Sequence, residues 1–525
     1  MQSDQANTYD EIPYGDHFFP FTHPIHLATL GTLFGIDAPA VERCRVLELG
    51  CAEGGNLLPM ALELPDAQFV GIDLSPRQIA NGQAVVKRLG LRNLDLRAMS
   101  ITEVDASFGS FDYIICHGVF SWVPEPVRDK ILAICSQNLA PQGLAYLSYN
   151  TYPGWHGRGM VRRLLAYHLG RTASATPLEQ VHEARSFLEE IVRVIPDKDS
   201  SYARILRTES AYLRGVPNTY LFHEHLEETN HPFYFHEFVA LAEAKRLKFL
   251  VEARSGGMSA NLPDDARESL EEWADDELGR EQYLDILCNR TFRQTLLTHV
   301  DVARLDEPAA DALDALWIST SLGPVSPDPD VVSLAPEEFR MAEGEANLST
   351  NDPLIKAALV ELFEIAPRSI RFAALWERVL SRLGEDPDSN PSRDPDHLKH
   401  ALLRCFMSSL IQLRTKPPAF AIALSERPVA SPLARVQAVD EERVINLRGR
   451  TVRLDPFERL VLRALNGSHD RRAVLEALLM SVDSGEFSIH EGGRPIEDRD
   501  RIAQIFGGEL EPCLERLAAR ALLVS

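Results

Sequence analysis

Short apolar runs alternate with helix-like segments from the N-terminus to about residue 170. The helical pattern is clearest from Pro76 to Gly90: Ser75 fits the N-cap, Pro76 the first turn and Gly90 the position just past the end. Strands that alternate with helices favour a parallel sheet covered by helices on both faces. The apolar runs that we predict to be its strands are RVLEL, QFVGID, LDLRAM, FDYIICHG and LAYLSYN.

Beyond residue 170 the helix-like segments are longer and carry more charged residues. LEQVHEARSFLEEIVRVI and DDARESLEEWADDELGREQYLDIL are typical of helices, and the Pro-rich stretch from Ser321 to Phe339 is typical of a link. Further on, RVINLRGRTVRLDPFERLVLRAL and HDRRAVLEALL indicate a hairpin beside short helices, as in winged-helix modules. We therefore predict an α/β protein with four parts: an N-terminal cap segment (1–40), a sheet domain (41–170), a mainly helical middle domain (171–325) and a mixed, winged-helix-like C-terminal region (335–525).

Composition narrows the class of protein. Of the 525 residues, 45% are hydrophobic and 25% are charged, which is typical of globular proteins. No apolar run reaches the roughly 18 residues that a membrane span needs, and the N-terminus has no basic region or apolar core of a signal peptide. Seven cysteines without paired metal spacing indicate reduced thiols, and the net charge of −23 opposes nucleic-acid binding. We expect a cytoplasmic protein with no membrane span and no nucleic-acid partner.

A glycine-rich turn follows the first predicted strand. ELGCAEGGN places Gly50, Gly54 and Gly55 where the chain has to turn sharply and where a ligand approaches the backbone. The spacing differs from the dinucleotide pattern G-x-G-x-x-G, and Glu53 stands among the glycines. A carboxylate in a pyrophosphate site would be repulsive. The turn therefore favours a cationic cofactor.

Polar residues also follow the next strands. Asp73 ends the second strand and can accept hydrogen bonds from ribose hydroxyls. AMSI, which ends at Ile101, follows the third strand and can flank an adenine; His117 follows the fourth. Ligands bind outside the carboxyl ends of strands in open α/β sheets, so we expect Gly50, Asp73, Ser100 and His117 at one edge. A Rossmann-like sheet that binds another nucleotide, or nothing, is the alternative.

This arrangement resembles the class I S-adenosylmethionine-dependent methyltransferases, whose pattern E-x-G-x-x-x-G followed by a strand-end Asp is matched by Glu48, Gly50, Gly54 and Asp73. Further stretches are similar to methyltransferases that carry a methyltransferase regulatory domain after the catalytic one. Within that group the chain resembles bacterial protein-lysine methyltransferases that act on outer membrane proteins, over nearly its whole length. The stretches that carry this resemblance are YDEIPYGDHFFPFTHP, SWVPEPVRDKIL, SYNTYPGW, YLFHEHLEETNHPFYFHEF, NRTFRQTLL, SERPVASPLAR and LDPFERLVLRALNG.

The resemblance implies a Rossmann-like methyltransferase sheet at 41–170, a regulatory domain at 171–325 and S-adenosyl-L-methionine as the cofactor. It also implies that Tyr14 belongs to a segment that folds over the cofactor on the substrate side. A small residue is common at the position of Cys51, so no thiol chemistry follows. The cofactor-binding residues that the resemblance implies are Glu48, Gly50, Cys51, Asp73, Leu74, Ser100, Ile101 and His117.

The stretch SYNTYPGW, after the fifth strand, borders the acceptor side of such folds. A lysine has to be neutral to attack, although its ordinary pKa is about 10.4, and an apolar aromatic channel lowers that pKa. Asn150 could aim an amine, and Tyr149, Tyr152 and Trp155 could wall such a channel. The alternative is that these rings pack the sheet against the helical domain. The candidate catalytic residues are Asn150, Tyr152 and Trp155, and the candidate substrate-binding residues are Tyr14, Trp122 and His223.

Two further groups invite a chemical role. In HEHLEE, His223 and Glu227 would share a helix face, but methyl transfer needs no metal and we predict none. A hydrogen-bonded role near the cleft, or packing, fits His223 better. Arg290 and Arg293 would lie near each other on a helix and are expected to form structural ion pairs with carboxylates. For His117 a pocket wall is favoured over a base.

Three functions remain open. The first is a protein-lysine methyltransferase whose partner is a protein substrate, such as an outer membrane protein precursor. The second is a small-molecule methyltransferase that uses the helical domain as a lid. The third is a non-catalytic scaffold that binds S-adenosyl-L-methionine. A homodimer is left open.

Overall fold

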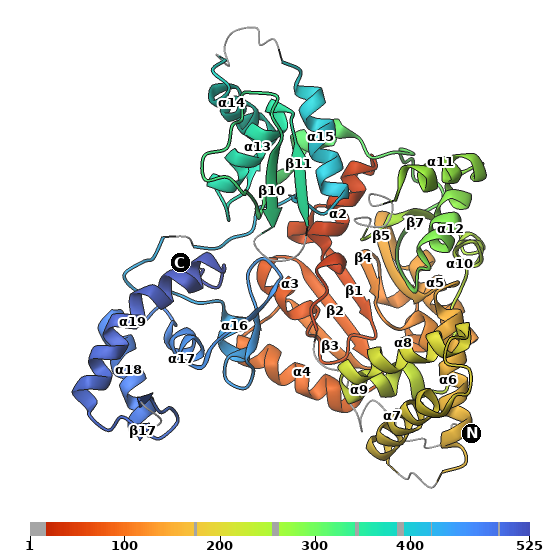
Figure 1. Ribbon diagram of the computed structural model, residues 1–525, viewed down its shortest axis with the longest axis horizontal. Helices are drawn as coiled ribbons and strands as arrows, with labels where there is room; N and C mark the ends of the chain where they lie inside the picture. Colours follow the sequence, from red (N-terminus) through yellow and green to blue (C-terminus); the bar gives the residue numbers. More distant parts are fainter. Residues whose placement is uncertain are drawn as a thin grey trace.

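A mixed seven-stranded sheet lies at the centre of the computed structural model, which describes residues 17–172, 176–254, 262–341, 346–385, 393–421, 423–491 and 494–524 (Figure 1). The strand order is β3-β2-β1-β4-β5-β7-β6. Strands β1 to β5 are parallel, as the alternating sequence pattern predicted, and β7 runs antiparallel to both β5 and β6. The strands are β1 (Arg45–Leu49), β2 (Gln68–Asp73), β3 (Leu94–Ala98), β4 (Phe111–Cys116), β5 (Leu139–Asn150), β6 (Leu247–Glu252) and β7 (Phe292–His299).

Helices cover both faces of the sheet. Successive side chains of a strand point to opposite sides, so each strand contributes to the hydrophobic core on each face. Val46 belongs to the core shared with α2, α3 and α4, whereas the next residue, Leu47, belongs to the core shared with α5 and α10. Helix α4 starts and ends as predicted: the Ser75 hydroxyl accepts a hydrogen bond from the backbone of Gln78, and Gly90 is left-handed. These helices are α2 (Pro24–Leu33), α3 (Leu57–Glu63), α4 (Pro76–Leu89), α5 (Glu125–Gln137) and α10 (Phe235–Glu243). The short 3-10 turns of this part are η1 (Pro20–Thr22), η2 (Val41–Arg43), η3 (Ile101–Glu103), η4 (Ala106–Phe108) and η5 (Phe120–Trp122).

The middle part of the chain is mainly helical, as expected, but it also completes the sheet. Helices α6 to α9 pack around a core of their own, and α11 and α12 lie beside β7 in Figure 1. Strands β6 and β7 come from the same range and extend the sheet beyond β5. Arg293 therefore lies on a strand and not on a helix, because Phe292–His299 pairs with a strand on each side. The helices are α6 (Trp155–Leu169), α7 (Pro177–Val194), α8 (Ser201–Gly215), α9 (Asn218–Leu221), the π-helical turn η6 (Phe222–Leu226), α11 (Asp264–Trp273) and α12 (Glu277–Cys288).

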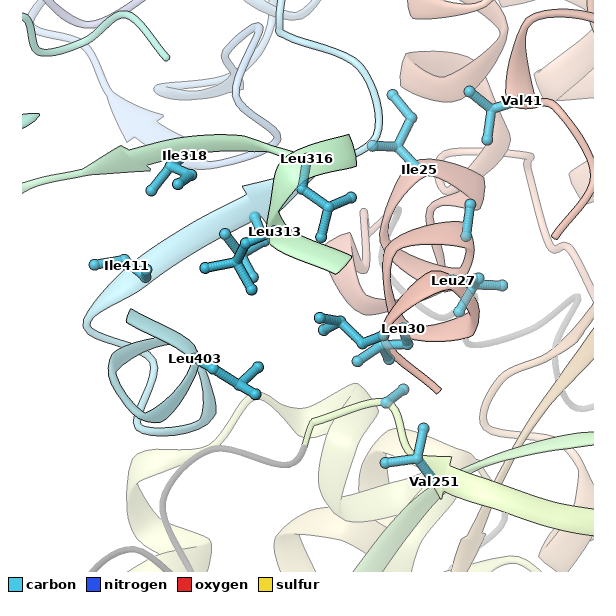
Figure 2. Close-up of a cluster of buried hydrophobic side chains, with 14 of the residues drawn as sticks. Ile25, Leu27, Leu30, Val41, Val251, Leu313, Leu316, Ile318, Leu403 and Ile411 are labelled. Carbon is cyan, nitrogen blue, oxygen red and sulfur yellow. The ribbon is translucent and has the colours of Figure 1, made fainter. Parts of the chain in front are cut away.

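A small α/β layer follows and packs on α2. Figure 2 shows Leu313, Leu316 and Ile411 facing Ile25 and Leu30, so this layer and the central sheet share one core. The predicted Pro-rich link from Ser321 to Phe339 carries the short strand β9 and the start of β10. The elements are η7 (Ala310–Ala315), β8 (Trp317–Thr320), β9 (Leu322–Pro324), β10 (Glu337–Met341), β11 (Asn347–Thr350), α13 (Pro353–Glu364), β12 (Ile370–Arg371), α14 (Phe372–Arg382), α15 (Pro395–Met407) and β13 (Ile411–Arg414).

The predicted region 335–525 is divided in the structure: its first part lies in this α/β layer, and its second part has the hairpin and short helices that the sequence predicted. This second part has its own hydrophobic core, and Figure 1 shows it on the opposite side of the sheet domain from α6–α9. Its elements are α16 (Pro432–Gln437), β14 (Arg443–Ile445), β15 (Thr451–Arg453), α17 (Pro456–Ala464), α18 (Arg471–Asp483), β16 (His490–Glu491), β17 (Arg494–Pro495) and α19 (Arg499–Ala519). Within the described residues, no helix combines the length and the apolarity that crossing a bilayer requires.

Candidate active site

The turn after β1 and the end of β2 are tied together. Gly50 has φ +79°, and a Cβ added to it would lie 2.5 Å from a methyl of Val119, so only glycine fits both the conformation and the space. The Asp73 carboxylate accepts one hydrogen bond from the Ala52 backbone N–H and another from that of Ser75, each at 2.9 Å. Asp73 is thereby fixed at the carboxyl edge of the sheet beside the glycine turn.

Glu48 is linked to the N-terminal segment through Asn56. The Asn56 side-chain amide donates to a carboxylate oxygen of Glu48 at 2.7 Å, and its carbonyl oxygen accepts from the backbone N–H of Phe19 at 2.9 Å. Thr22 is hydrogen-bonded to the same amide, at 2.9 Å to its Nδ2. Both Glu48 and Asn56 are buried. The segment that begins at residue 17 is therefore fastened to the glycine turn.

His117 lies at the end of β4 under the ring of Phe19. The two ring centroids are 3.8 Å apart, and the His117 Nδ1 is 2.9 Å from the Tyr146 hydroxyl. That hydroxyl also accepts from Gln294 of β7 at 2.9 Å. Burial lowers the pKa of His117 from 6.5 to about 4, so the ring is neutral near pH 7. A neutral, stacked imidazole has the properties of a pocket wall.

The other cofactor candidates lie at the ends of β1, β2 and β3. Leu74 is exposed beyond β2, and Ser100 is the N-cap of the short turn Ile101–Glu103 beyond β3. Cys51 is buried, and its sulfur is packed so closely over Gly71 that an added Cβ there would come within 2.8 Å of it. The Cys51 thiol therefore points into the sheet, and only its backbone is left to line a site.

The end of β5 fixes Asn150 at the same edge. Asn150 is 3% exposed, and its backbone N–H donates to the Ser121 hydroxyl at 2.9 Å. Its side-chain Nδ2 donates to the Asn230 Oδ1 at 3.2 Å. Tyr152 follows, stacked on His156 with centroids 4.3 Å apart and inclined to Tyr234 at 5.2 Å.

The remaining aromatic residues of this stretch are packed. Trp155 is 2% exposed and meets Trp122 edge-on at 6.1 Å, and the guanidinium of Arg162 lies over Trp122. Tyr149 was expected to help wall a channel, but its ring stacks on Phe238 at 3.9 Å within the core between the sheet and α10. Successive side chains of a strand point to opposite faces of the sheet, so Tyr149 cannot share the face of Asn150.

His223 is buried in the π-helical turn η6 beside α6. Its Nδ1 lies 3.2 Å from a carboxylate oxygen of Glu227, so the two residues share a face as predicted. Arg162 of α6 donates to the backbone carbonyls of Glu224 and Glu227, which fastens this turn to the helix that follows Asn150. No group of three or more metal-binding side chains occurs in the part of the chain that the structure describes. Tyr14 lies outside the described residues.

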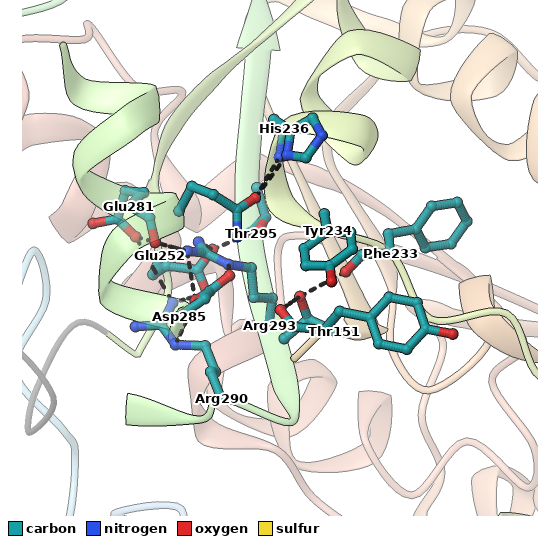
Figure 3. A network of polar contacts seen from close by, with 12 residues as sticks. Thr151, Phe233, Tyr234, His236, Glu252, Glu281, Asp285, Arg290, Arg293 and Thr295 are labelled. Carbon is teal, nitrogen blue, oxygen red and sulfur yellow. Dashed lines mark hydrogen bonds and ion pairs between the residues drawn. The ribbon is translucent and has the colours of Figure 1, made fainter. Parts of the chain in front are cut away.

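Two arginines and three acids form a buried network between β7, β6 and α12 (Figure 3). Arg293 is fully buried, donates to both carboxylate oxygens of Asp285 at 2.8 and 2.9 Å, and donates to Glu252 at 2.9 Å. Arg290 lies 3.2 Å from Asp285, and Glu281 is 3.1 Å from Arg293. Burial raises the pKa of Asp285 to about 6 in spite of both arginines. The ion pairs predicted for Arg290 and Arg293 are therefore present, and they join the sheet to α12.

Comparison with known proteins identifies the family. Residues 46–143 match a methyltransferase domain, residues 217–299 the predicted methyltransferase regulatory domain, and residues 426–522 the PKMT C-terminal winged helix domain. An uncharacterized protein of Rickettsia prowazekii is 36% identical over 535 residues, which span 99% of this chain and 94% of the relative. The chain belongs to the PKMT family of methyltransferases.

Two further comparisons agree with this assignment. A second uncharacterized Rickettsia prowazekii protein is 38% identical over 243 residues, which are 46% of this chain and 96% of that protein. The structure of PKMT2 from Rickettsia typhi in complex with AdoHcy matches with a TM-score of 0.84 at 28% identity, over 98% of this chain and 100% of that one. The protein is an S-adenosylmethionine-dependent methyltransferase, and S-adenosyl-L-methionine is its cofactor.

The residues at the carboxyl edge fit that cofactor. S-adenosylmethionine carries a positively charged sulfonium and an amino group. Carboxylates and aromatic faces attract such groups, whereas another cation would repel them. This edge of the sheet has the carboxylates of Glu48 and Asp73 and the ring of Phe19, and the lowered pKa of His117 keeps its imidazole uncharged. The side chains at this edge of the sheet are therefore compatible with a cationic ligand.

Sequence reasoning missed several residues of the site. Asn56 stands directly after the glycine pair, and a polar side chain at the start of the following helix was the available signal. Phe19 lies in a stretch that the resemblance had singled out, but no pattern assigned its ring to His117. Tyr146 and Gln294 come together only because β7 pairs with β5, and no local signal reports that pairing.

Proposed function

We propose that this PKMT-family enzyme methylates the side-chain amine of lysines in a protein substrate, with outer membrane protein precursors as the substrate class. The observation that carries this proposal is the end-to-end similarity to PKMT2, which extends through the winged-helix region at a TM-score of 0.84. We infer a cytoplasmic enzyme, since all seven cysteines are free thiols and most are buried.

We assign cofactor binding to the carboxyl edge of β1 to β4. In this proposal Asp73 accepts hydrogen bonds from the ribose hydroxyls, and Glu48 faces the cationic end of the cofactor with Asn56 orienting its carboxylate. The backbone of Gly50 and Cys51 lines the turn, and His117 forms a wall. Leu74, Ser100 and Ile101 flank the adenine at the ends of β2 and β3.

We assign acceptor binding to the end of β5. The Asn150 Nδ2 is engaged by Asn230, so Oδ1 is the atom that we expect to accept a hydrogen bond from the incoming amine. The rings of Tyr152, His156 and Tyr234 contact one another just after the end of β5, and we assign them as an aromatic wall of the acceptor path. We assign Trp155, Trp122 and His223 to the support of this wall, because they are packed behind it through α6 and η6.

In this proposal the chain's own residues position the acceptor amine and the cofactor for the reaction. When bound, S-adenosylmethionine supplies an electrophilic methyl group on its sulfonium, which a neutral amine displaces in line. The aromatic wall lowers the pKa of a lysine amine by keeping water away from it. Asn150 then aims the nitrogen, because its own position is fixed by Ser121 and Asn230. No covalent bond to the protein is needed.

Labelled cofactor tests the proposal. The purified chain is incubated with methyl-labelled S-adenosylmethionine and an unfolded outer membrane protein, and the protein fraction is hydrolysed in acid. We expect methyl-lysine as the labelled product, and Asn150→Ala should lower the rate at saturating cofactor. Asn93→Ala is the matched control: Asn93 is a buried asparagine that donates to Ala61 and Leu64 at the amino end of β3. Label confined to small molecules would contradict a protein acceptor.

A further inference from the structure

The hairpin turn of the winged-helix region touches the N-terminal segment of the chain. Gly449, between β14 and β15, has φ +69°, and a Cβ added to it would lie 2.5 Å from Cε1 of Phe18. The backbone of the turn therefore rests directly on the Phe18 ring. Only glycine meets both requirements at this position, the left-handed conformation and the close approach.

The turn is a rigid surface because the winged-helix region holds it from inside. The Asn446 side-chain oxygen accepts hydrogen bonds from the backbone N–H groups of Arg448 and Arg450, at 3.0 and 2.9 Å. The Asn446 Nδ2 donates to the carbonyl of Arg520 at 2.9 Å, and the Leu447 N–H donates to the carbonyl of Ala521, just after α19, also at 2.9 Å. These four hydrogen bonds restrain the turn, so an added Cβ at Gly449 would push on the Phe18 ring.

Phe18 is the neighbour of the residue that covers the candidate cofactor site. The Phe19 N–H donates to Asn56 and its ring lies on His117, while Asn56 holds Glu48. The peptide bond between Phe18 and Phe19 thus connects the contact with the winged-helix turn to Asn56, Glu48 and His117 at the cofactor edge. Helix α16 of the winged-helix region also contacts α4, the helix that begins after Asp73.

Phe18 has a second anchor on the sheet domain. Its ring meets the imidazole of His23 edge-on at 6.3 Å, and the His23 Nε2 lies 3.2 Å from a carboxylate oxygen of Glu63. Glu63 is also paired with Arg414 of β13. The segment from Phe18 to His23 is therefore held between the sheet domain and the winged-helix turn.

We propose that the winged-helix region is a positioning element for the cofactor: the turn at Gly449 holds Phe18, which in turn holds the Phe19 ring on His117 and the Phe19 amide on Asn56. A segment that is already in place costs less conformational entropy when the cofactor binds, so the cofactor binds more tightly. This role is independent of the acceptor, and the lysine proposal can fail without affecting it.

Cofactor binding by the full-length chain tests this role. S-adenosylhomocysteine is titrated into the parent, Gly449→Ala and Gly467→Ala in a calorimeter. Gly467 is the matched control, because it lies in the same region with φ +83° and its added Cβ would meet Val429 at 2.8 Å. We expect Kd to rise at least about fivefold in Gly449→Ala. We expect less than about a twofold change in Gly467→Ala.

A double-mutant cycle decides whether the effect passes through Phe18. Phe18→Ala should raise Kd by a similar factor, and Gly449→Ala should add nothing in the Phe18→Ala background, because the ring that it displaces is gone. Melting temperatures report whether each variant is folded. Should Gly449→Ala not fold, Phe18→Ala alone carries the test. A parent-like Kd in Phe18→Ala, equal effects of the two glycine variants, or full additivity in the double variant would each overturn the proposal.

Discussion

Replacing Arg293 by methionine should destabilise the sheet domain strongly. The side chain is fully buried and pairs with Asp285, Glu252 and Glu281 at 2.8–3.1 Å. Methionine keeps the apolar stem of the side chain but carries no charge, so Arg293→Met leaves three carboxylates with Arg290 as their remaining partner in the network. Breaking a buried ion pair by removing one partner costs about 3–5 kcal/mol. At about 2–4 °C per kcal/mol for a unit of 150–250 residues, the loss is at least about 6 °C in Tm.

The same substitution should change the pH dependence of stability. Arg293 and Arg290 both lower the pKa of Glu252 and of Asp285, although burial already raises that of Asp285 to about 6. With Arg290 alone left, burial raises the pKa of both carboxylates above their values in the parent. The folded variant therefore binds more protons than the folded parent, and its stability relative to the parent falls as pH rises. The loss of Tm relative to the parent should be larger at about pH 8 than at about pH 5.

Scanning calorimetry measures this effect, and a surface pair provides the control. The chain has several domains, so the relevant transition is the one that S-adenosylhomocysteine shifts upward. Arg246 and Asp301 lie 2.7 Å apart, as close as the buried pairs, but their side chains are 69% and 80% exposed. Arg246→Met should therefore cost no more than about 1 kcal/mol. The reasoning is refuted if the two variants melt alike, or if the Arg293→Met loss does not depend on pH.

Three other changes test the site and the helical domain. Asp73→Ala should raise the Kd of S-adenosylhomocysteine more than about tenfold, because it removes the carboxylate that we assign to the ribose hydroxyls. By calorimetry, Asp95→Ala, an exposed carboxylate on β3, should bind like the parent. Tyr152→Ala should lower kcat/KM for the acceptor about five- to tenfold, because it removes a ring of the aromatic wall, with cofactor Kd unchanged; an unchanged rate would show that the ring does not line the acceptor path. Burial raises the pKa of Glu224 to about 7, so its folded form binds the proton more tightly and its contribution to stability falls as pH rises from about 4.5 to 7. Glu224→Gln should remove this pH dependence from Tm. A variant whose Tm changes with pH as that of the parent does would contradict the raised pKa of Glu224.

The sheet of the first 170 residues follows from local signals. Each strand is a short apolar run, and α4 is bounded by Ser75 and Gly90, whose preferences act over one turn of chain. Parallel strands share one carboxyl edge, so Gly50 and Asp73 could be brought together without coordinates. The sequence pattern could not assign β6 and β7 to the same sheet, because that depends on pairing β5 with a strand about 150 residues away.

The division of roles within SYNTYPGW required the tertiary structure. Alternation along a strand says that Tyr149 and Asn150 face opposite sides, but it does not say which side meets the site. The packing of Phe238 against Tyr149 decides that, because α10 covers one face and leaves Asn150 on the other, with Ser121 and Asn230. One ring of the motif therefore contributes to stability, whereas its neighbour is placed to act on an acceptor.

The sequence by itself determined the class of the enzyme, the five parallel strands of its first 170 residues, and the places of Glu48, Gly50 and Asp73 near strand ends, because turns, caps and strand ends are local properties. Tertiary structure alone decided what surrounds them. Phe19 reaches His117, Gln294 reaches Tyr146, and Gly449 reaches Phe18 across contacts between segments far apart in the chain. The physical reason is that burial and close packing select such partners by shape, and shape exists only after the chain has folded.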